Sequence, residues 1–314
     1  MRRLGGQDDE LQKIQEDLKR LEDKETLYGI IQNLKVTFDM KDIMTGISCT
    51  LHTIALDQKD EKVLAWLKFV DTSANHDLAR KKHETTTGNW FLELPSFQEW
   101  TKATKASLWL YGIPGAGKTI LCSTIIEHTI KICNSTPFDR YAYFYFDFNE
   151  KRTVVSMLSS IIAQLCTQKN AVPVELHQLY RQCDNGQRQP GQTNLLKIFF
   201  SLLTTSHRTF VILDALDECA LGVDRNDLLE TIKEMVTTSS KYVNVLVTSR
   251  KEKDIKDKLE PRIHQQVALT EGVVGADISI HVRRCLECDG RLSKWPSDTK
   301  QEIQDILEKR ADGM

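Results

Sequence analysis

The sequence predicts an α/β fold in which a mostly parallel sheet lies between two layers of helices. Two observations lead to this prediction. From residue 107 onward, short apolar runs alternate with helical patterns, which is typical of βαβ units. A glycine-rich segment also follows the first apolar run and opens a helical pattern. We expect an N-terminal helical segment before this three-layer α/β/α core and a small helical region after it.

The predicted strands are continuous apolar runs, which suit strands that are buried on both faces of a parallel sheet. They are residues 108–111, 141–146, 209–213 and 243–248. The helices predicted between them are residues 118–133, 153–167, 192–205 and 226–238. Two further helical patterns, 275–288 and 298–310, form the predicted C-terminal helical region.

Four parts are predicted along the chain. They are an N-terminal helical segment at 1–60, a linker that packs on the core at 61–104, the α/β core at 105–270 and a helical part at 271–314. Within the first part, apolar residues recur at helical spacing over residues 8–36. That helix packs on its own domain or binds a partner, because two heptads are too few to indicate a coiled coil.

The segment before the core is expected to contain a helix followed by a loop. Residues 61–70 form a helical candidate with one apolar face. The polar stretch 71–88 that follows is interpreted as a linker or surface loop.

Composition excludes several classes of protein. The 314 residues carry a formal net charge of −2, which gives no basic bias toward nucleic acid. No apolar run approaches the length of a membrane span, and the first residues lack the apolar region of a secretory signal. The 8 cysteines are scattered, and several lie in apolar runs, which suits a reducing compartment. We therefore expect an intracellular, cytoplasmic protein.

Residues 112–119 read Gly-Ile-Pro-Gly-Ala-Gly-Lys-Thr and match G-x-x-x-x-G-K-[ST] at every fixed position. Glycines let the backbone curl so that its N–H groups point at an anion, and the following helix directs its positive end at the same point. Lys118 is placed to reach the β- and γ-phosphates, and Thr119 to ligate Mg²⁺. The predicted nucleotide-binding residues are Gly112, Pro114, Gly115, Ala116, Gly117, Lys118, Thr119 and Ile120.

A metal-bound nucleotide also needs a carboxylate, which we expect on a neighbouring strand. The apolar run 210–213 ends in Asp214, and ligands bind at the carboxyl ends of such strands. Asp214 is therefore a predicted metal ligand. Asp217 and Glu218 follow at spacings that place them on the same side, so one of them is expected to orient or deprotonate the attacking water. Another strand ends at Arg250, which is placed to stabilise charge on the γ-phosphate. Asp217, Glu218 and Arg250 are thus the predicted catalytic residues.

Taken together, these stretches resemble the NACHT class of signal-transduction ATPases, a STAND-type group of P-loop NTPases, in its fungal and nephrocystin-like branch. The residues that carry the resemblance are 87–92, 112–119, 211–218, 247–250 and 308–314. The resemblance spans about residues 60–314. It implies a switch, of a kind used in immunity-like signalling, in which ATP or GTP with Mg²⁺ is bound and slowly hydrolysed to drive opening and oligomerisation.

The resemblance has further implications and one departure. Relatives carry an N-terminal effector region and C-terminal repeats, so we expect this chain to be a fragment or a truncated form. Thr87 and Gly88 are expected near the nucleotide base. The family often has glycine after the first acid, where this sequence has Ala215.

Three functions remain open at this point: a signalling switch with slow hydrolysis, a nucleotide-bound scaffold with negligible turnover, and a small-molecule kinase. The three acids at 214–218 favour the first. The guanine signature Asn-Lys-x-Asp is absent, which mildly favours ATP over GTP. The expected partners are the nucleotide, further copies of the chain bound through the NTPase core, and unidentified proteins bound by the N-terminal helices. Neither nucleic acid nor a membrane span is expected.

Overall fold

The computed structural model describes residues 58–169, 171–204, 206–237 and 242–310, together with Lys13, Glu16, Lys19 and Arg20. The chain divides into two compact units, Met1–Glu61 and Lys62–Met314, and the fold below is that of the second unit. The helix predicted at 8–36 lies outside the described residues except for those four, which are helical. Its predicted partner-binding role stays a prediction.

Five parallel strands form one sheet in the order β2-β3-β4-β1-β5. The strands are β1 (Ala106–Gly112), β2 (Asp139–Tyr145), β3 (Arg208–Asp214), β4 (Val243–Ser249) and β5 (Gln265–Leu269). The prediction of a three-layer α/β/α fold is confirmed, and each of the four predicted strands is present. Strand β5 was not predicted; it pairs with β1 at one edge of the sheet.

Helices precede, connect and follow the strands. They are α2 (Ser73–Lys82), α3 (Asn89–Glu93), α4 (Pro95–Lys102), α5 (Lys118–Ser135), α6 (Val154–Lys169), α7 (Val174–Gln182), α8 (Gln192–Leu203), α9 (Val223–Thr237), α10 (Lys253–Leu259), α11 (Glu271–Cys288) and α12 (Ser297–Arg310), with short 3₁₀ turns η1 (Leu216–Glu218) and η2 (Leu292–Lys294). Residues 58–66 are also helical. None of the described helices has both the length and the apolar character needed to cross a membrane.

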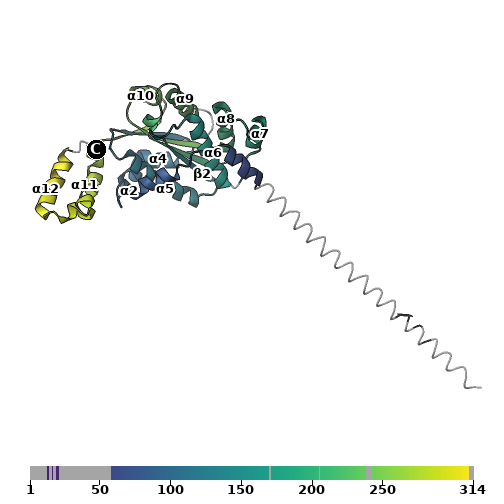
Figure 1. The fold of residues 1–314 in the computed structure, drawn as a ribbon, viewed down its shortest axis with the longest axis horizontal. Helices are drawn as coiled ribbons and strands as arrows, with labels where there is room; N and C mark the ends of the chain where they lie inside the picture. Colours follow the sequence, from purple (N-terminus) through teal and green to yellow (C-terminus); the bar gives the residue numbers. More distant parts are fainter. Residues whose placement is uncertain are drawn as a thin grey trace, which may run out of the picture. The chain divides into compact units, whose positions relative to one another are not determined.

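The two faces of the sheet bury separate apolar clusters. On β1, Leu108 and Leu110 pack into the cluster formed with α3, α4 and α5, whereas Trp109 packs into the cluster formed with α6 to α10. This alternation is what a parallel strand buried on both faces requires. Figure 1 shows the result, with α9 and α10 on one side of the sheet and α4 and α5 on the other. Complete burial of each such side chain contributes about 1.5–3 kcal/mol to stability.

The polar stretch 71–88 contains a helix, so its interpretation as a loop is wrong for residues 73–82. Helix α2 packs against α5, and its His76 is buried there. The two ring nitrogens of His76 bond the Tyr145 hydroxyl and the Glu127 carboxylate, each at 2.9 Å. Three basic residues in its last turn complement the helix dipole. Polar tertiary contacts, rather than an apolar stripe, therefore hold this helix in place.

Strand β2 lies at the other edge of the sheet, and two glutamines of α6 pair with its outer backbone. Gln164 accepts from the Tyr143 N–H at 3.0 Å and donates to the Tyr143 carbonyl at 2.8 Å. Gln168 makes the same pair of bonds with Tyr141, at 3.2 and 2.6 Å. The match is geometric, since four helical residues and two strand residues both span about 6–7 Å. Side chains thus satisfy backbone groups that an edge strand otherwise leaves open for pairing.

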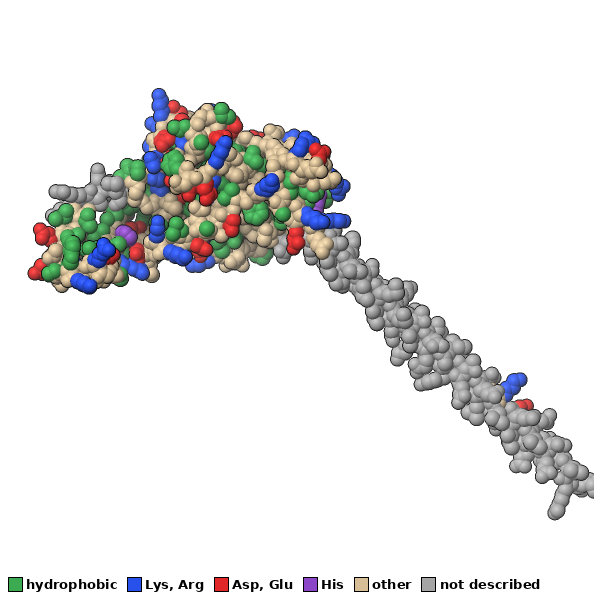
Figure 2. Space-filling view, in the orientation of Figure 1, with side chains coloured by type: hydrophobic (Ala, Val, Ile, Leu, Met, Phe, Trp, Pro, Cys, Tyr) green, Lys and Arg blue, Asp and Glu red, His purple; other side chains and the backbone are tan. Residues whose placement is uncertain are grey.

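The surface of the unit mixes charges of both signs. Figure 2 shows lysine and arginine interspersed with aspartate and glutamate over the face in view. No large field of one sign is present among the described residues on that face, in keeping with the small net charge.

Candidate functional site

The glycine-rich segment is a loop between β1 and α5, at the carboxyl end of the sheet. Gly115 and Gly117 have left-handed backbone conformations, with φ of +81° and +79°. At Gly112 the reason for glycine is space, because an added Cβ would lie 3.0 Å from the Cβ of Leu269. The sequence folds this way because glycine alone adopts these conformations at no steric cost. Helix α5 begins directly afterwards at Lys118, so its N–H groups face the loop.

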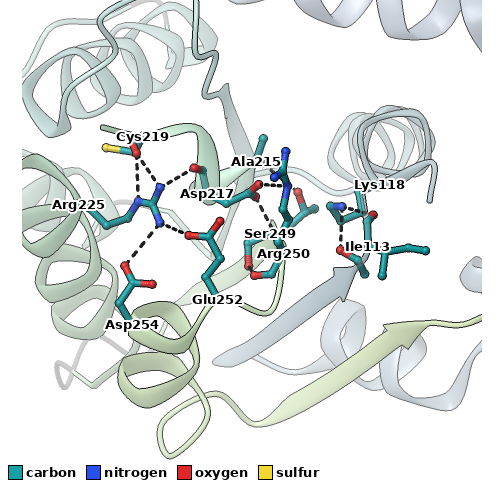
Figure 3. A network of polar contacts seen from close by, with 12 residues as sticks. Ile113, Lys118, Ala215, Asp217, Cys219, Arg225, Ser249, Arg250, Glu252 and Asp254 are labelled. Carbon is teal, nitrogen blue, oxygen red and sulfur yellow. Dashed lines mark hydrogen bonds and ion pairs between the residues drawn. The ribbon is translucent and has the colours of Figure 1, made fainter. Parts of the chain in front are cut away.

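Lys118 closes this loop with its own side chain. Its Nζ donates to the carbonyl oxygens of Gly112 at 3.0 Å and Ile113 at 2.8 Å (Figure 3). Burial lowers the pKa of Lys118, and the negative charges of Asp217 and Asp214 oppose that shift. An ammonium group held by two neutral carbonyls in a partly buried site is well placed to exchange them for phosphate oxygens.

Asp214 ends strand β3 and is almost completely buried, with 2% of its surface exposed. Burial raises its pKa, and hydrogen bonds from Thr248, Thr119 and Cys122 act in the opposite direction, together with the nearby charge of Lys118. The Thr248 hydroxyl donates to Asp214 Oδ1 at 2.6 Å. The predicted metal ligands Thr119 and Asp214 are therefore in direct contact, with Lys118 close by.

The donor set of this pair fits Mg²⁺. A hydroxyl and a carboxylate are oxygen ligands, and Mg²⁺ in phosphate sites takes one or two protein ligands, with phosphate and water completing its octahedron. No group of three or more His, Cys, Asp or Glu side chains is placed to hold a metal ion within the described part of the chain.

The strand order corrects one expectation about this site. Strand β3 is not the neighbour of β1, because β4 lies between them and pairs with both. The contact between the glycine-rich loop and Asp214 is made across the end of β4, through Thr119 at the start of α5. Strand order depends on tertiary packing, so the apolar runs alone did not determine it.

Ala215 adopts a backbone conformation that is unusual for alanine. Its φ of +57° lies in the left-handed region, which glycine adopts freely and alanine adopts at a cost. The Ala215 N–H donates to the Thr248 hydroxyl at 2.9 Å, so Thr248 contacts both Asp214 and the residue after it. Glycine would adopt the same turn without strain.

Asp217 and Arg250 are paired with each other. The Arg250 Nε lies 2.9 Å from Asp217 Oδ2, and the Arg250 backbone N–H donates to Asp217 Oδ1 at 3.0 Å. Asp217 is buried, whereas 40% of the Arg250 side chain is exposed. The charge of Arg250 contributes to lowering the pKa of Lys118, so both cations face the same region. Both oxygens of Asp217 are thus used to hold Arg250.

Glu218 differs from Asp217 in its surroundings. It is half-buried, and burial raises its pKa, with repulsion from Asp217 and Asp214 adding to the effect. A carboxylate with a raised pKa is a better proton acceptor near neutral pH than an unperturbed one. Of the two acids in this turn, Asp217 is thus paired with Arg250, whereas Glu218 has the raised pKa.

Sequence reasoning missed Arg225, which lies in α9 with 2% of its surface exposed. Figure 3 shows its guanidinium between the acidic turn and the segment after β4. The sequence does not show whether an arginine in a helix is buried or exposed. No sequence pattern therefore indicated the position of Arg225.

A cavity of about 480 Å³ opens beside the glycine-rich loop. Gly115, Ala116, Gly117 and Ile120 line this cavity, and α11 supplies further lining residues. Thr87 and Gly88, expected near the base, also line it. Its volume matches that of ordinary small-ligand sites.

Helix α11 is tied to the rim of this cavity by one carboxylate. Oδ2 of Asp277 accepts from the Gly88 N–H at 2.8 Å and from Trp90 Nε1 at 2.9 Å. Gly88 has a φ of +75°, and an added Cβ would lie 2.9 Å from a methyl group of Leu121. Trp90 thus bonds to α11 in addition to packing on the core.

Comparison with known proteins agrees with these motifs. The profile of the family described as Nephrocystin 3, N-terminal, matches residues 86–250. The vegetative incompatibility protein HET-E-1 of Podospora anserina is 30% identical over 277 residues, which are 81% of this chain and 19% of that protein. The chain therefore spans about a fifth of this relative's length.

Solved structures with a similar fold are more distant. The Aeropyrum pernix ORC1 protein, solved in complex with DNA, has 15% identity and a TM-score of 0.44, covering 71% of this chain and 54% of that one. Cdc6p from Pyrobaculum aerophilum has 14% identity and a TM-score of 0.43, covering 78% and 62%. At these identities the likeness concerns the fold alone.

Proposed function

The chain belongs to the Nephrocystin 3, N-terminal, family and has a P-loop NTPase fold, and from this premise we propose that it binds a Mg²⁺–nucleoside triphosphate and hydrolyses it slowly as a NACHT-type switch. One observation supports this proposal most strongly. Lys118, Thr119 and Asp214 come from two separate segments and interact at one point at the carboxyl end of the sheet.

Each residue has a distinct role in this proposal. The backbone N–H groups of Ile113 and of residues 115–117, together with the Lys118 ammonium, bind the phosphates, and Thr119 and Asp214 hold Mg²⁺. Bound Mg²⁺ supplies charge neutralisation at the β- and γ-phosphate oxygens.

The hydrolytic step uses the remaining polar residues. Glu218 accepts the proton of the attacking water, because its raised pKa suits that transfer. Arg250, oriented by Asp217, stabilises the charge that develops on the γ-phosphate. Slow turnover is part of the proposal because the resemblance to NACHT-type switches implies it.

The cavity beside the loop holds the base and ribose in this proposal. ATP and GTP both fit its size, so both nucleotides belong to the proposal. The cavity wall formed by α11 couples nucleotide occupancy to the position of that helix, through Asp277 and its bonds to Gly88 and Trp90.

The wider biological setting follows from the relatives and from cysteine usage. The name of the Podospora anserina relative, a vegetative incompatibility protein, supports a role in a signalling response of that type. We place the protein in the cytoplasm, which is supported by the seven described cysteines, all free thiols and five of them buried. Self-association through the NTPase core is part of the proposed switch.

Nucleotide binding and turnover by the purified chain test the proposal. Lys118→Ala removes the phosphate-binding ammonium and should weaken binding of both ATP and GTP at least tenfold. Glu218→Gln should retain binding and slow hydrolysis. Lys131→Ala is the matched control, because Lys131 is an exposed lysine of the same helix α5, away from the loop.

The outcomes separate the alternatives. Equal affinity in the wild type and Lys118→Ala would contradict the site. Equal and vanishing turnover in the wild type and Glu218→Gln, with binding intact, would favour a nucleotide-bound scaffold over a hydrolytic switch.

A further inference from the structure

Each nitrogen of the buried Arg225 guanidinium has a partner, either in the acidic turn after β3 or in the segment after β4. Its Nε donates to the Cys219 carbonyl at 3.1 Å, and its Nη2 donates to the same carbonyl at 2.7 Å and to the Asp217 carbonyl. Its Nη1 lies 3.0 Å from Glu252 Oε2 and 3.5 Å from Asp254 Oδ2 (Figure 3). One side chain thus links the turn after β3 to the segment after β4.

The atoms that Arg225 contacts surround Glu218. The carbonyls of residues 217 and 219 are those on either side of it, so the backbone of Glu218 is held from both directions. The second anchor, Glu252, lies two residues beyond Arg250. Because the side chain of Asp217 also holds Arg250, the contacts form a closed ring: Arg225, the acidic turn, Arg250 and the segment that follows it.

The chemistry of this ring argues for a positioning role. A buried guanidinium costs a large desolvation penalty, and apolar side chains of similar volume often stabilise a core equally well. What arginine adds is a rigid fork of five donors whose geometry fixes several acceptors at once. General bases and charge-stabilising groups need placement within about 0.5 Å, and support from a second layer of hydrogen bonds provides it.

We propose that Arg225 is a positioning residue for nucleotide hydrolysis, holding Glu218 and Arg250 in register with each other. It touches neither the phosphate-binding loop nor Lys118, so it acts on the chemical step and not on nucleotide affinity. This inference rests on the proposed function.

The test measures separately how each substitution changes nucleotide binding and how it changes turnover. Arg225→Lys keeps the positive charge and loses the fork, so kcat should fall about tenfold to a hundredfold, while the KM and the Kd for the Mg²⁺–nucleotide stay within about threefold. The double variant Glu252→Gln/Asp254→Asn weakens the same ring from its more exposed side, and should lower kcat in the same direction with less effect on folding. Lys233→Met is the control, because Lys233 is a cation on the same helix whose ion pair with Glu230 lies at the surface.

A second readout separates positioning from general damage. In a Glu218→Gln background, Arg225→Lys should lower the residual turnover by a smaller factor than in the wild type, since one of the two groups that it positions is already gone. Full retention of turnover by the Arg225→Lys variant would overturn this inference alone. An equal fold loss of turnover in the wild-type and Glu218→Gln backgrounds would also overturn it. Absence of turnover in the wild type would overturn the proposed function and this inference together.

Discussion

Replacing Thr248 with valine removes one buried hydroxyl that serves two partners at the site. The hydroxyl donates to Asp214 Oδ1 at 2.6 Å and accepts from the Ala215 N–H at 2.9 Å. Thr248 has no exposed surface, and valine has nearly the same shape. The substitution therefore changes hydrogen bonding with little change in packing.

The expected loss of stability follows from the two bonds. A hydrogen bond to a charged group contributes about 1.5–3 kcal/mol, and leaving a buried N–H without a partner costs about 1–3 kcal/mol. One hydroxyl serves both, so the effects overlap, and we expect the free energy of unfolding to fall by about 3–5 kcal/mol. For a domain of this size, each kcal/mol shifts Tm by about 2–4 °C, so Tm should fall by about 6–20 °C.

The same substitution changes the response to pH. The bond from Thr248 opposes the raised pKa of Asp214, so that pKa should rise further in the variant. A carboxyl group whose pKa is raised by folding binds more protons in the folded state, so it lowers stability as pH increases through that pKa. The stability difference between variant and wild type should therefore narrow in acid, where Asp214 is protonated in both. Binding of Mg²⁺–nucleotide needs the ionised carboxylate. As the pH is lowered, the variant should therefore lose binding at a higher pH than the wild type does.

Thermal and urea unfolding at two pH values, beside nucleotide titrations, measure these effects. Thr248→Ser is the matched control, because it keeps the hydroxyl and loses only a methyl group. A valine variant as stable as the serine variant, with the same pH dependence of binding, would show that the Thr248 hydroxyl does not stabilise this site.

Three further predictions concern the turn, the general base and the sheet edge. Ala215→Gly should raise the free energy of unfolding by about 0.5–1 kcal/mol, because it relieves the left-handed alanine, and chemical denaturation measures this; a loss of stability would contradict the strain. The kcat of hydrolysis should decline as pH falls through the raised pKa of Glu218, since only the ionised form accepts a proton, and a kcat–pH profile with its limb at or below the ordinary glutamate pKa would count against that role. The double variant Gln164→Leu/Gln168→Leu should expose the edge of β2 and cause self-association, seen by light scattering after gel filtration, whereas a monodisperse variant matching the wild type would show that the edge needs no cover.

The sequence predicted the elements whose signals are local. The loop at 112–119 was readable because its glycines and Lys118 occur at fixed spacing, and the strand ending at Asp214 was readable because four buried residues precede the acid. The position of β4 between β1 and β3 was not readable, because strand order follows from packing between distant segments.

Other features depend on contacts that sequence patterns do not carry. Strand β5 reads Gln-Gln-Val-Ala-Leu and lies half-exposed at an edge, so it lacks a long apolar run. Helix α2 is held through buried His76 and its polar partners, and a polar sequence of that kind reads as a loop. The contacts of Arg225 form only when the turn after β3 and the segment after β4 meet around it in the folded protein.

In the proposed site, Thr119 and Asp214 hold one metal ion beside phosphates bound by Lys118. Mn²⁺ is a paramagnetic substitute for Mg²⁺, so electron paramagnetic resonance can measure its binding together with a non-hydrolysable nucleoside triphosphate. We expect bound Mn²⁺ with phosphorus coupling in the wild type, and loss of that signal in both Thr119→Ala and Asp214→Asn. The same signal at the same affinity in Asp214→Asn would contradict it.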